Sequence, residues 1–562
     1  MATDAELRAL EASLRLMVGN LTAPVGDEKL DPSTQSADYD AMLPYWNMVD
    51  TILGGKQAMQ DANETYLYRF QEEASDSRDS RNRTYDPYTL RLNKTPFTNL
   101  YDDILKNLSS KPFAKELTLK EGTPDQFKKL GENVDGQGNN LHVFCQNVFR
   151  SALNHAIAYI LVDYTRAQPR ADGQPLSRAD EAAQNLRPYW CFIPATRMLA
   201  IYSDYDGGQE IITHARIFEP AITLQGFQEV AVERIRVLER EVLERDGAGK
   251  AIKWGAATYM LWEKLTPTPE NPKGLWQLVD AGVYTVGIIP LVPVVLTERR
   301  QGSYRAEPAL HNLAYMQIAE YNQESNVMGV SDATCFPMFV CVGLEKKKGD
   351  DNLAVGPRSV IMIPPPASGS AGDFKSIEPS GASVRVIMDQ LKEIRTEMRD
   401  LGMQPLTQSN LTVITTGQVA VKANSAVQAW AIRFKDAVEQ AWKITAEWLG
   451  LALEPEIVIH TDYSAAMDEG KGFEGVMKLR TNKDVSRETA IGAAQRYGYL
   501  PDDFDIQADE EQLAKEQADA SSLMGEVQID PRTGKPIPPL GQAAQSGQQQ
   551  QPPRANGGLP IQ

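Results

Sequence analysis

The most regular alternation of apolar and polar residues in the chain lies at residues 381–401. Apolar side chains recur there at intervals of three and four residues, at Val384, Ile387, Leu391, Ile394 and Met398. This spacing places them on one stripe of an α-helix, and charged residues cover its other faces. The stripe predicts a helix packed against a partner, either as a short coiled-coil seam or as an ordinary amphipathic helix on its neighbour.

Two further helices are predicted on either side of this segment. Pro308 suits the first position of a helix that runs to about residue 329. A longer helix is predicted at about 417–450, before the stop at Gly450. Its stripe consists of Val427, Trp430, Phe434, Val438, Ala441, Thr445 and Trp448.

A small β module is predicted between the first two of these helices. Strand-like runs occur at Cys335–Val342 and Arg358–Ile363, and Asp373–Ile377 offers a third. The charged turn between the first two runs would place lysines at a hairpin tip, namely Lys346, Lys347 and Lys348. These lysines either contact phosphate or belong to a solvated turn, because Asp350 and Asp351 largely cancel their charge.

The first 300 residues predict a mixed region. Residues 1–40 are mostly polar and read as a mobile arm, and helices are expected at about 38–60, 86–110 and 141–161. Strand-like runs then recur up to residue 296. The segment 228–245 is either a helix or an extended hairpin, because its charges alternate while its apolar residues partly follow a period of two. The predicted fold class is therefore α+β and mainly helical.

Length and composition limit the classes of protein. At 562 residues the chain is longer than one hydrophobic core usually supports, so several parts are expected. No uninterrupted apolar stretch reaches about 18 residues, so no membrane-spanning helix is expected. The four cysteines stand singly and predict buried free thiols in a reducing cytoplasm.

The net charge is −18, and it is unevenly distributed. Residues 502–530 hold ten acidic residues and one lysine, a local charge of −9. A protein that grips DNA by neutralising phosphates should be basic, so this balance argues against tight nucleic-acid binding. An acidic surface is compatible with DNA that slides past without adhering.

One stretch, residues 401–421, contains no charged residue at all. It is too polar for a buried core, because hydroxyl and amide side chains dominate it. Such a neutral loop could face a polyanion without the counterion release that makes DNA stick. The candidate DNA-facing residues are Gln404, Thr407, Gln408, Ser409, Asn410 and Thr412.

Catalytic signatures are missing from the sequence. Gly54-Gly55-Lys56-Gln57 lacks the upstream glycine and the hydroxyl of a phosphate-binding loop. The five histidines are scattered, and no pair has metal-ligand spacing. The sequence therefore predicts no enzyme, no catalytic or metal-ligating residue and no cofactor.

The order of these elements resembles the portal proteins of tailed bacteriophages. Part of the resemblance lies in the N-terminal sequence, at Tyr45-Trp46, Ile52-Leu53-Gly54-Gly55, Tyr66-Leu67, Tyr88, Arg91-Leu92 and Lys111-Pro112-Phe113. Leu401-Gly402 through Thr416, and Ala423 through Gly450, carry the rest. Over about residues 40–500, the sequence is similar to a portal family known as a conserved phage domain of unnamed function.

The resemblance implies a division of the chain into named parts. A mobile arm at 1–40 would precede a wing (41–305), a stem helix (306–329), a β-rich clip (330–379) and a second stem helix (380–401). A tunnel loop (402–416), a long wing helix with a strand (417–465), an acidic helical crown (466–526) and a disordered tail (527–562) would follow. The stripe at 381–401 would then pack the stem helices together.

The resemblance also implies a function and partners. The chain would form a ring, typically of twelve copies, at one capsid vertex of the virion, after assembly in the host cytoplasm. Double-stranded DNA would pass through it without sequence specificity. The expected partners are the major capsid protein, the scaffolding protein, the terminase large subunit and the head–tail adaptor, with no membrane. The alternatives are another phage structural protein of the tail or minor capsid and, from a different class, a nucleotide-dependent enzyme.

Overall fold

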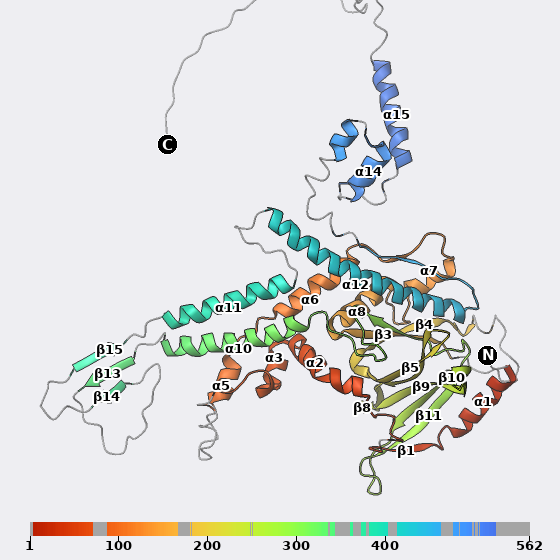
Figure 1. The fold of residues 1–562 in the computed structure, drawn as a ribbon, viewed down its shortest axis with the longest axis horizontal. Coiled ribbons are helices and arrows are strands. Elements are labelled where there is room, and N and C mark those ends of the chain that lie inside the picture. Colours follow the sequence, from red (N-terminus) through yellow and green to blue (C-terminus); the bar gives the residue numbers. More distant parts are fainter. Residues whose placement is uncertain are drawn as a thin grey trace, which may run out of the picture. The chain divides into compact units, whose positions relative to one another are not determined.

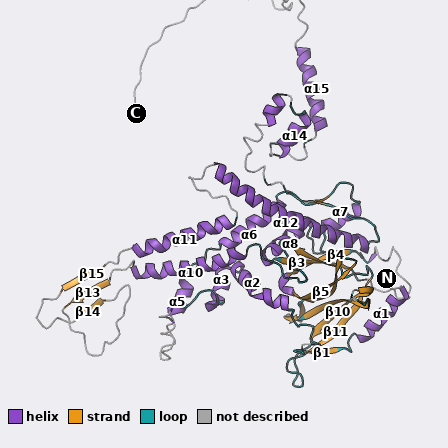
Figure 2. Cartoon of the chain, in the orientation of Figure 1, coloured by secondary structure: helices purple, strands orange, loops and turns teal. Residues whose placement is uncertain are grey.

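The computed structural model divides into two compact units, residues 1–464 and 465–562. It describes residues 4–27, 29–70, 73, 87–166, 180, 183–247, 249, 251–334, 338–342, 360–363, 373–377, 382–402, 413–461, 463, 476–482, 484–496, 499–500, 504 and 506–523. Helices and strands are both abundant in the first unit (Figure 2), which agrees with the predicted α+β class. Among the described residues, no helix is long and apolar enough to cross a membrane.

Residues 4–24 are held by contacts that the expected mobile arm does not include. Helix α1 (Asp4–Met17) packs against strand β11 (Leu275–Tyr284), and strand β1 (Thr22–Pro24) pairs with the same strand. Ala23 is buried in this pairing. The segment is held because its backbone hydrogen bonds complete the edge of a sheet, which its polar composition does not reveal.

Helix α2 (Ala37–Leu53) begins where Ser36 accepts a hydrogen bond from the Tyr39 backbone, and α3 (Gly55–Asp61) follows it. The single helix expected at 86–110 is instead two helices, α5 (Pro87–Lys94) and α6 (Leu100–Ser110). Pro96 lies in the break, since it has no N–H to donate and restricts Thr95 before it. Asn99 then caps α6 through a hydrogen bond from the Asp102 backbone.

A three-stranded antiparallel sheet forms the centre of the first unit. Its order is β12 (Leu291–Val295), β3 (Ile157–Tyr164), β4 (Pro188–Pro194), and helix α8 (Leu141–His155) packs on it. Strand β3 is almost entirely apolar, because it is covered on both faces. Two short strands, β2 (Thr118–Leu119) and β16 (Ile457–Val458), pair beside helix α7 (Asp125–Glu132).

A larger antiparallel sheet has six strands in the order β1-β11-β10-β9-β6-β5 (Figure 1). Its remaining members are β5 (Met198–Asp206), β6 (Gln209–Phe218), β9 (Arg234–Arg245) and β10 (Ala251–Lys264). A separate hairpin of β7 (Ala221–Gln225) and β8 (Gln228–Val232) is inserted between β6 and β9. The segment 228–245 is thus extended, which resolves the choice that the sequence left open.

The helices predicted around the charge-free stretch are present. They are α10 (His311–Thr334), α11 (Ala382–Leu401) and α12 (Val413–Trp448). Helix α12 lies across the three-stranded sheet, and Phe434 is fully buried against Phe113 and Phe149. Trp430, predicted to be equally buried, is only partly covered.

The second unit contains helical residues 476–481, α14 (Arg487–Arg496) and α15 (Ile506–Leu523). Arg487 on α14 forms ion pairs with Asp509 and Glu510 on α15, at 2.6 and 3.4 Å. Part of the predicted acidic crown is therefore helical. The tail predicted at 527–562 lies outside the described residues.

Candidate functional site

Helices α10 and α11 form an antiparallel pair (Figure 1). Gln323 on α10 donates to Gln390 on α11 at 3.1 Å, and farther along the pair Glu320 meets Arg395. Residue numbers thus fall on α10 as they rise on α11. Strand β13 (Met338–Val342) begins four residues after α10 ends, and β15 (Asp373–Ile377) ends five residues before α11 begins. The same end of the helix pair therefore leads into the small sheet.

The small sheet has the order β14-β13-β15, with β14 at Val360–Ile363. Strands β13 and β14 are parallel, whereas β13 and β15 are antiparallel. The three strands of the β module were correctly predicted. The predicted hairpin between the first two strands is wrong, because a hairpin requires antiparallel strands. Lys346, Lys347 and Lys348, placed at that hairpin tip, lie outside the described residues.

The apolar stripe of α11 lies toward α10 but is only partly covered by this chain. Met398 is fully buried. The other four stripe residues are half-buried, namely Val384, Ile387, Leu391 and Ile394. Val386 and Met388 on other faces of α11 are exposed. The end of α11 nearest the small sheet therefore retains apolar surface.

A buried cluster of charged groups lies where α10, α11 and the start of α6 meet. Arg395 on α11 donates to Glu320 on α10, from Nε at 2.8 Å and from Nη2 at 2.7 Å, and also to Glu324. Both carboxylates are buried, so one guanidinium serves two of them. The Oε2 atom of Glu324 has no hydrogen-bond partner among the described residues.

Neighbouring polar side chains connect this cluster to α6. Thr98 donates its hydroxyl to Glu324 at 2.7 Å. Gln317 donates to Glu320 at 3.1 Å and to the Thr98 carbonyl at 3.0 Å, while its own oxygen accepts from the Tyr101 backbone at 3.0 Å. The first turn of α6 is thereby fixed to α10, and through Arg395 to α11.

The electrostatics of the cluster are unbalanced. Burial raises the pKa of Glu320 to about 7, the charge of Glu324 adds to this, and Arg395 opposes it. Two ionised carboxylates beside one arginine would leave a buried negative charge, which is costly away from water. A proton on the pair at neutral pH relieves this cost.

A second arginine joins α5 to the same helix. Arg91 forms an ion pair with Glu73 at 2.8 Å and donates to Ser325 on α10 at 2.8 Å. Burial alone would raise the pKa of Glu73, but hydrogen bonds from Arg91 and the Phe70 backbone lower it below its usual value. Helix α10 is thus anchored along its length by α5, α6 and α11.

Gly402 ends α11 for a steric reason. The φ of Gly402 is not positive, so this glycine is not there to provide a left-handed helix cap. A Cβ at this position would lie 2.7 Å from Cδ1 and Cγ2 of Ile104 on α6. Only glycine therefore allows the end of α11 to approach α6 this closely.

The candidate DNA-facing residues between α11 and α12 lie outside the described residues, namely Gln404, Thr407, Gln408, Ser409, Asn410 and Thr412. Helix α12 begins at Val413, four residues before the predicted start and inside the segment predicted as loop 402–416. The uncharged residues 413–421 are therefore helical, and the rest of the predicted loop, 403–412, lies outside the described residues.

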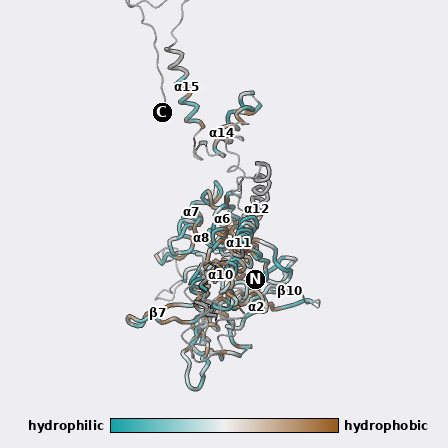
Figure 3. Tube along the Cα trace, turned by 90° about the vertical axis from the view of Figure 1, so that its left-hand side faces the viewer, coloured by the Kyte–Doolittle hydropathy of each residue, from teal (hydrophilic) through white to brown (hydrophobic). Residues whose placement is uncertain are grey.

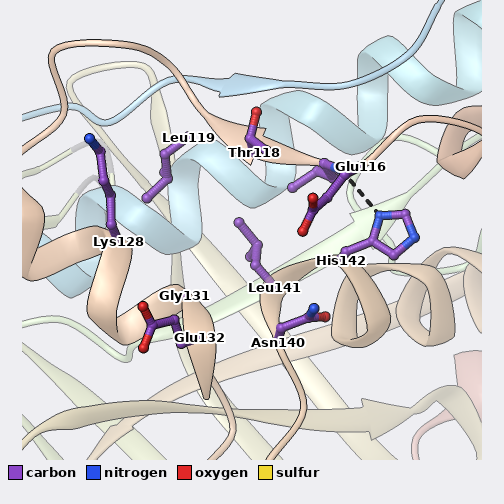
Figure 4. A pocket seen from close by; sticks show the side chains of 10 residues that line it. Glu116, Thr118, Leu119, Lys128, Gly131, Glu132, Asn140, Leu141 and His142 are labelled. Atoms are coloured by element: carbon purple, nitrogen blue, oxygen red, sulfur yellow. Dashed lines mark hydrogen bonds between the residues drawn. The ribbon is translucent and has the colours of Figure 1, made fainter. Parts of the chain in front are cut away.

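The first unit also contains a cavity of about 340 Å³ beside β2, α7 and the start of α8 (Figure 4). The Leu117 backbone donates to Nδ1 of His142 there at 3.1 Å, and Glu116 lies beside this histidine. Lys128 and Glu132 line the opposite side. Among the described residues, no group of three or more potential metal ligands comes together.

The cluster around Arg395 was not predicted from the sequence. A signal was present on α10, where Gln317, Glu320 and Glu324 recur at intervals of three and four residues. This spacing places three polar side chains on one stripe, which is the pattern usually read for apolar residues. The pattern indicates a polar contact between two helices only when the opposite helix is known to carry Arg395.

Comparisons with known proteins match part of the chain to a described domain. Residues 309–449 match a family model described as "Domain of unknown function (DUF4055)". This range covers α10, the small sheet, α11 and α12. No curated protein matches the chain.

Solved structures of gene transfer agent particles are similar to this chain at low identity. A chain from the neck of the native particle, computed with C12 symmetry, has a TM-score of 0.35 and 9% identity, and the match covers 69% of this chain and 87% of that chain. A chain from the virion of the native particle has a TM-score of 0.36 and 8% identity, with 71% and 89% covered. A chain from the neck of the empty particle, computed with C6 symmetry, has a TM-score of 0.36 and 9% identity, with 70% and 89% covered. TM-scores this low do not establish a common fold.

Proposed function

We propose that this chain is the portal subunit of a tailed bacteriophage or phage-like particle. Copies of it would form a closed ring at one capsid vertex of the virion, through which double-stranded DNA enters and leaves. The ring has no catalytic step of its own, and the energy for packaging comes from the terminase that docks on it.

One observation carries the proposal: the order and pairing of α10, the small sheet, α11 and α12. The two antiparallel helices α10 and α11 lead into a small sheet at one end. At the other end, α11 is followed by the uncharged residues 403–412 and by the 36-residue helix α12. A stem of two helices, a clip at its tip, a neutral loop and a long helix are the parts that the sequence resemblance implies.

The charges agree with a channel that DNA passes without binding. The chain carries −18, and the stretch 401–421 carries none. Adhesion to a duplex grows with each phosphate that a cation neutralises, so a neutral loop within an acidic ring keeps adhesion weak. An acidic crown would repel DNA within roughly 10 Å at moderate salt.

The remaining roles follow from the same assignment. The small sheet would contact the terminase large subunit during packaging and the head–tail adaptor afterwards. The outer faces of the first unit would contact the major capsid protein and the scaffolding protein. A ring of twelve copies is the expected assembly.

Electron microscopy of the purified full-length chain tests the proposal. We expect closed rings with an axial channel wide enough for a DNA duplex. Monomers, sheets or tubes under all ionic conditions would exclude a portal and favour another structural component of the particle. Hydrolysis of ATP by the purified chain would favour the nucleotide-dependent enzyme.

A further inference from the structure

The helix pair α10–α11 is buried at one end only. Among the described residues of α10, Glu324 and Ser325 are the last buried ones, and residues 326–331, which follow toward the small sheet, are all at least partly exposed. On α11, Met398 is buried, whereas residues 384–394, nearer the small sheet, are not. Figures 1 and 3 both show the two helices next to α6. The layer around Glu324 and Met398 is therefore the last buried one before the pair extends toward the small sheet.

Two contacts join this layer to α6. The first is the Arg395 cluster, which consists of Arg395, Glu320, Glu324, Gln317 and Thr98. Thr98, just before α6, donates to Glu324 at 2.7 Å and accepts from Arg395 at 3.3 Å. The second contact is apolar and lies between Gly402, at the end of α11, and Ile104 on α6. The two contacts are about two turns of α11 apart, so together they determine the inclination of α11 to α6.

The Arg395 cluster contains more carboxylates than cations. Glu320 and Glu324 lie one turn apart on α10, and Arg395 donates to both. If both carboxyl groups are ionised, the cluster carries an excess negative charge in a buried site. The Oε2 atom of Glu324 has no hydrogen-bond partner among the described residues. A proton bound by one of the two carboxyl groups removes this excess charge.

Among the described residues, the neighbouring elements supply no second cation to the two carboxyl groups. Arg91 on α5 reaches α10, but its guanidinium is paired with Glu73 at 2.8 Å. The groups from the start of α6 are the Thr98 side chain and carbonyl and the Tyr101 backbone, all of them uncharged. The other charged residues of α11 are exposed. Tyr321 on α10 keeps its proton at neutral pH, because burial raises its pKa to about 12.

We propose that the Arg395 cluster is a latch that a bound proton keeps closed. While the two carboxyl groups hold one proton, Arg395 balances the remaining charge and α11 stays fixed to α6. When the proton leaves, Glu320 and Glu324 repel each other, and one of them turns toward water and loses its hydrogen bond to Gln317 or Thr98. The end of α11 then loosens from α6, and the small sheet moves with the helix pair. This inference goes beyond the proposed function and does not require a ring, because all of these groups belong to one chain.

The latch responds to pH near neutrality. The pKa of Glu320 is raised to about 7, first by burial and then by the charge of Glu324, while Arg395 opposes the rise. The side chain of Arg395 is 30% exposed, so water reaches the cluster along it and a proton can leave without unfolding of the chain. Above this pKa the closed state loses the proton that stabilises it. The latch therefore opens as the pH rises and closes as the pH falls.

Hydrogen–deuterium exchange of the full-length chain tests the latch. After correction for the pH dependence of intrinsic exchange, we expect the protection of the amides in residues 396–402 to fall about tenfold between pH 6 and pH 8. This fall follows from a pKa of about 7 for Glu320 in the closed state and its ordinary value of 4.5 in the open state. Residues 434–445 of α12 should keep their protection, because the opening is local.

Glutamine variants identify the responsible groups. In Glu320→Gln and in Glu324→Gln one carboxylate remains for one guanidinium, so the protection of residues 396–402 should be the same at pH 6 and pH 8. Glu393→Gln changes an exposed carboxyl group on α11, is the matched control and should keep the tenfold fall. Circular dichroism checks that each variant is folded at both pH values.

Each outcome decides for or against the latch. Equal protection of residues 396–402 at both pH values in the unsubstituted chain would overturn the inference, and so would a fall that persists in both glutamine variants. A parallel loss of protection at 434–445 would also overturn it, because the chain would then unfold as a whole. Rings without pH-dependent exchange would leave the portal assignment standing, and pH-dependent exchange in a chain that forms no rings would leave the latch standing.

Discussion

Arg395 on α11 donates from its Nε to Glu320 on α10 at 2.8 Å, although Glu320 is completely buried. The same guanidinium also serves Glu324, so the helix pair is joined by a cluster with more negative than positive groups. In the proposed ring this cluster lies at the base of the stem, where it fixes the direction in which the stem leaves the rest of the subunit.

The first prediction concerns the pH dependence of this cluster. The pKa of Glu320 is about 7 in the folded chain, above its ordinary value of 4.5. The folded state therefore holds a proton that the unfolded chain releases between these values, so stability falls as the pH rises from about 4.5 to 7. Glu320→Gln removes this loss. Between pH 5 and pH 8, the free energy of unfolding of the variant should therefore fall by about 2 kcal/mol less than that of the unsubstituted chain.

Urea denaturation followed by circular dichroism at both pH values measures the effect. Glu393→Gln, an exposed carboxylate on the same helix, is the control and should not change the difference between pH 5 and pH 8. An unchanged pH dependence in Glu320→Gln would mean that Glu320 is ionised throughout this range.

The second prediction concerns the guanidinium itself. Arg395→Ala leaves two buried carboxylates without their cation and should lower the free energy of unfolding by about 3 kcal/mol at pH 8. The triple variant Arg395→Met/Glu320→Gln/Glu324→Gln removes all the charges and should recover most of the loss. Failure of the triple variant to recover stability would show that packing by the arginine, and not charge balance, holds the helices together.

The third prediction concerns the contact between Gly402 and Ile104. Gly402→Ala would push its methyl group into Ile104, since the two carbons would be 2.7 Å apart. We expect a loss of about 1–3 kcal/mol in the free energy of unfolding. The double variant Gly402→Ala/Ile104→Ala should lose less than the sum of the two single changes, because the second removes the clash. Additive losses would place the strain elsewhere.

The fourth prediction separates two aromatic residues of α12 that the sequence pattern treats alike. Phe434 is completely buried between Phe113 and Phe149, so Phe434→Ala should cost about 3–5 kcal/mol. Trp430 is only partly buried, so Trp430→Ala should cost roughly 1–2 kcal/mol. Equal losses in thermal or urea unfolding would mean that Trp430 is more deeply covered than the subunit alone provides.

The helices of the first unit were predictable from sequence wherever one apolar stripe decides the structure. The stripes at 381–401 and 417–450 each belong to a helix within a few residues of the predicted bounds. The start of α12 was set too late, because Val413 to Thr416 contain β-branched and hydroxyl residues that propensity alone assigns poorly.

Pairing between distant segments could not be read from the sequence. Strand β1 pairs with β11 some 250 residues later, and no local pattern identifies such a partner. The parallel direction of β13 and β14 could not be predicted either, because the sequence of each strand is compatible with both directions of pairing. The Arg395 cluster was not predicted because its members come from three separate elements. Charged residues on a single helix are usually interpreted as its solvent-exposed face.

The last prediction concerns DNA in the proposed channel. If residues 403–412 line it, Gln408→Lys or Asn410→Lys would add a ring of cations to a neutral surface. Duplex DNA should then be retained on purified rings at low salt, with a logarithmic salt slope steeper by about one for each phosphate contacted. Filter binding across a salt series measures this, and Gln137→Lys in the exposed loop before α8 is the control. Equal, weak binding by all three variants would place this segment away from the DNA, because a cation within the channel cannot avoid the phosphates.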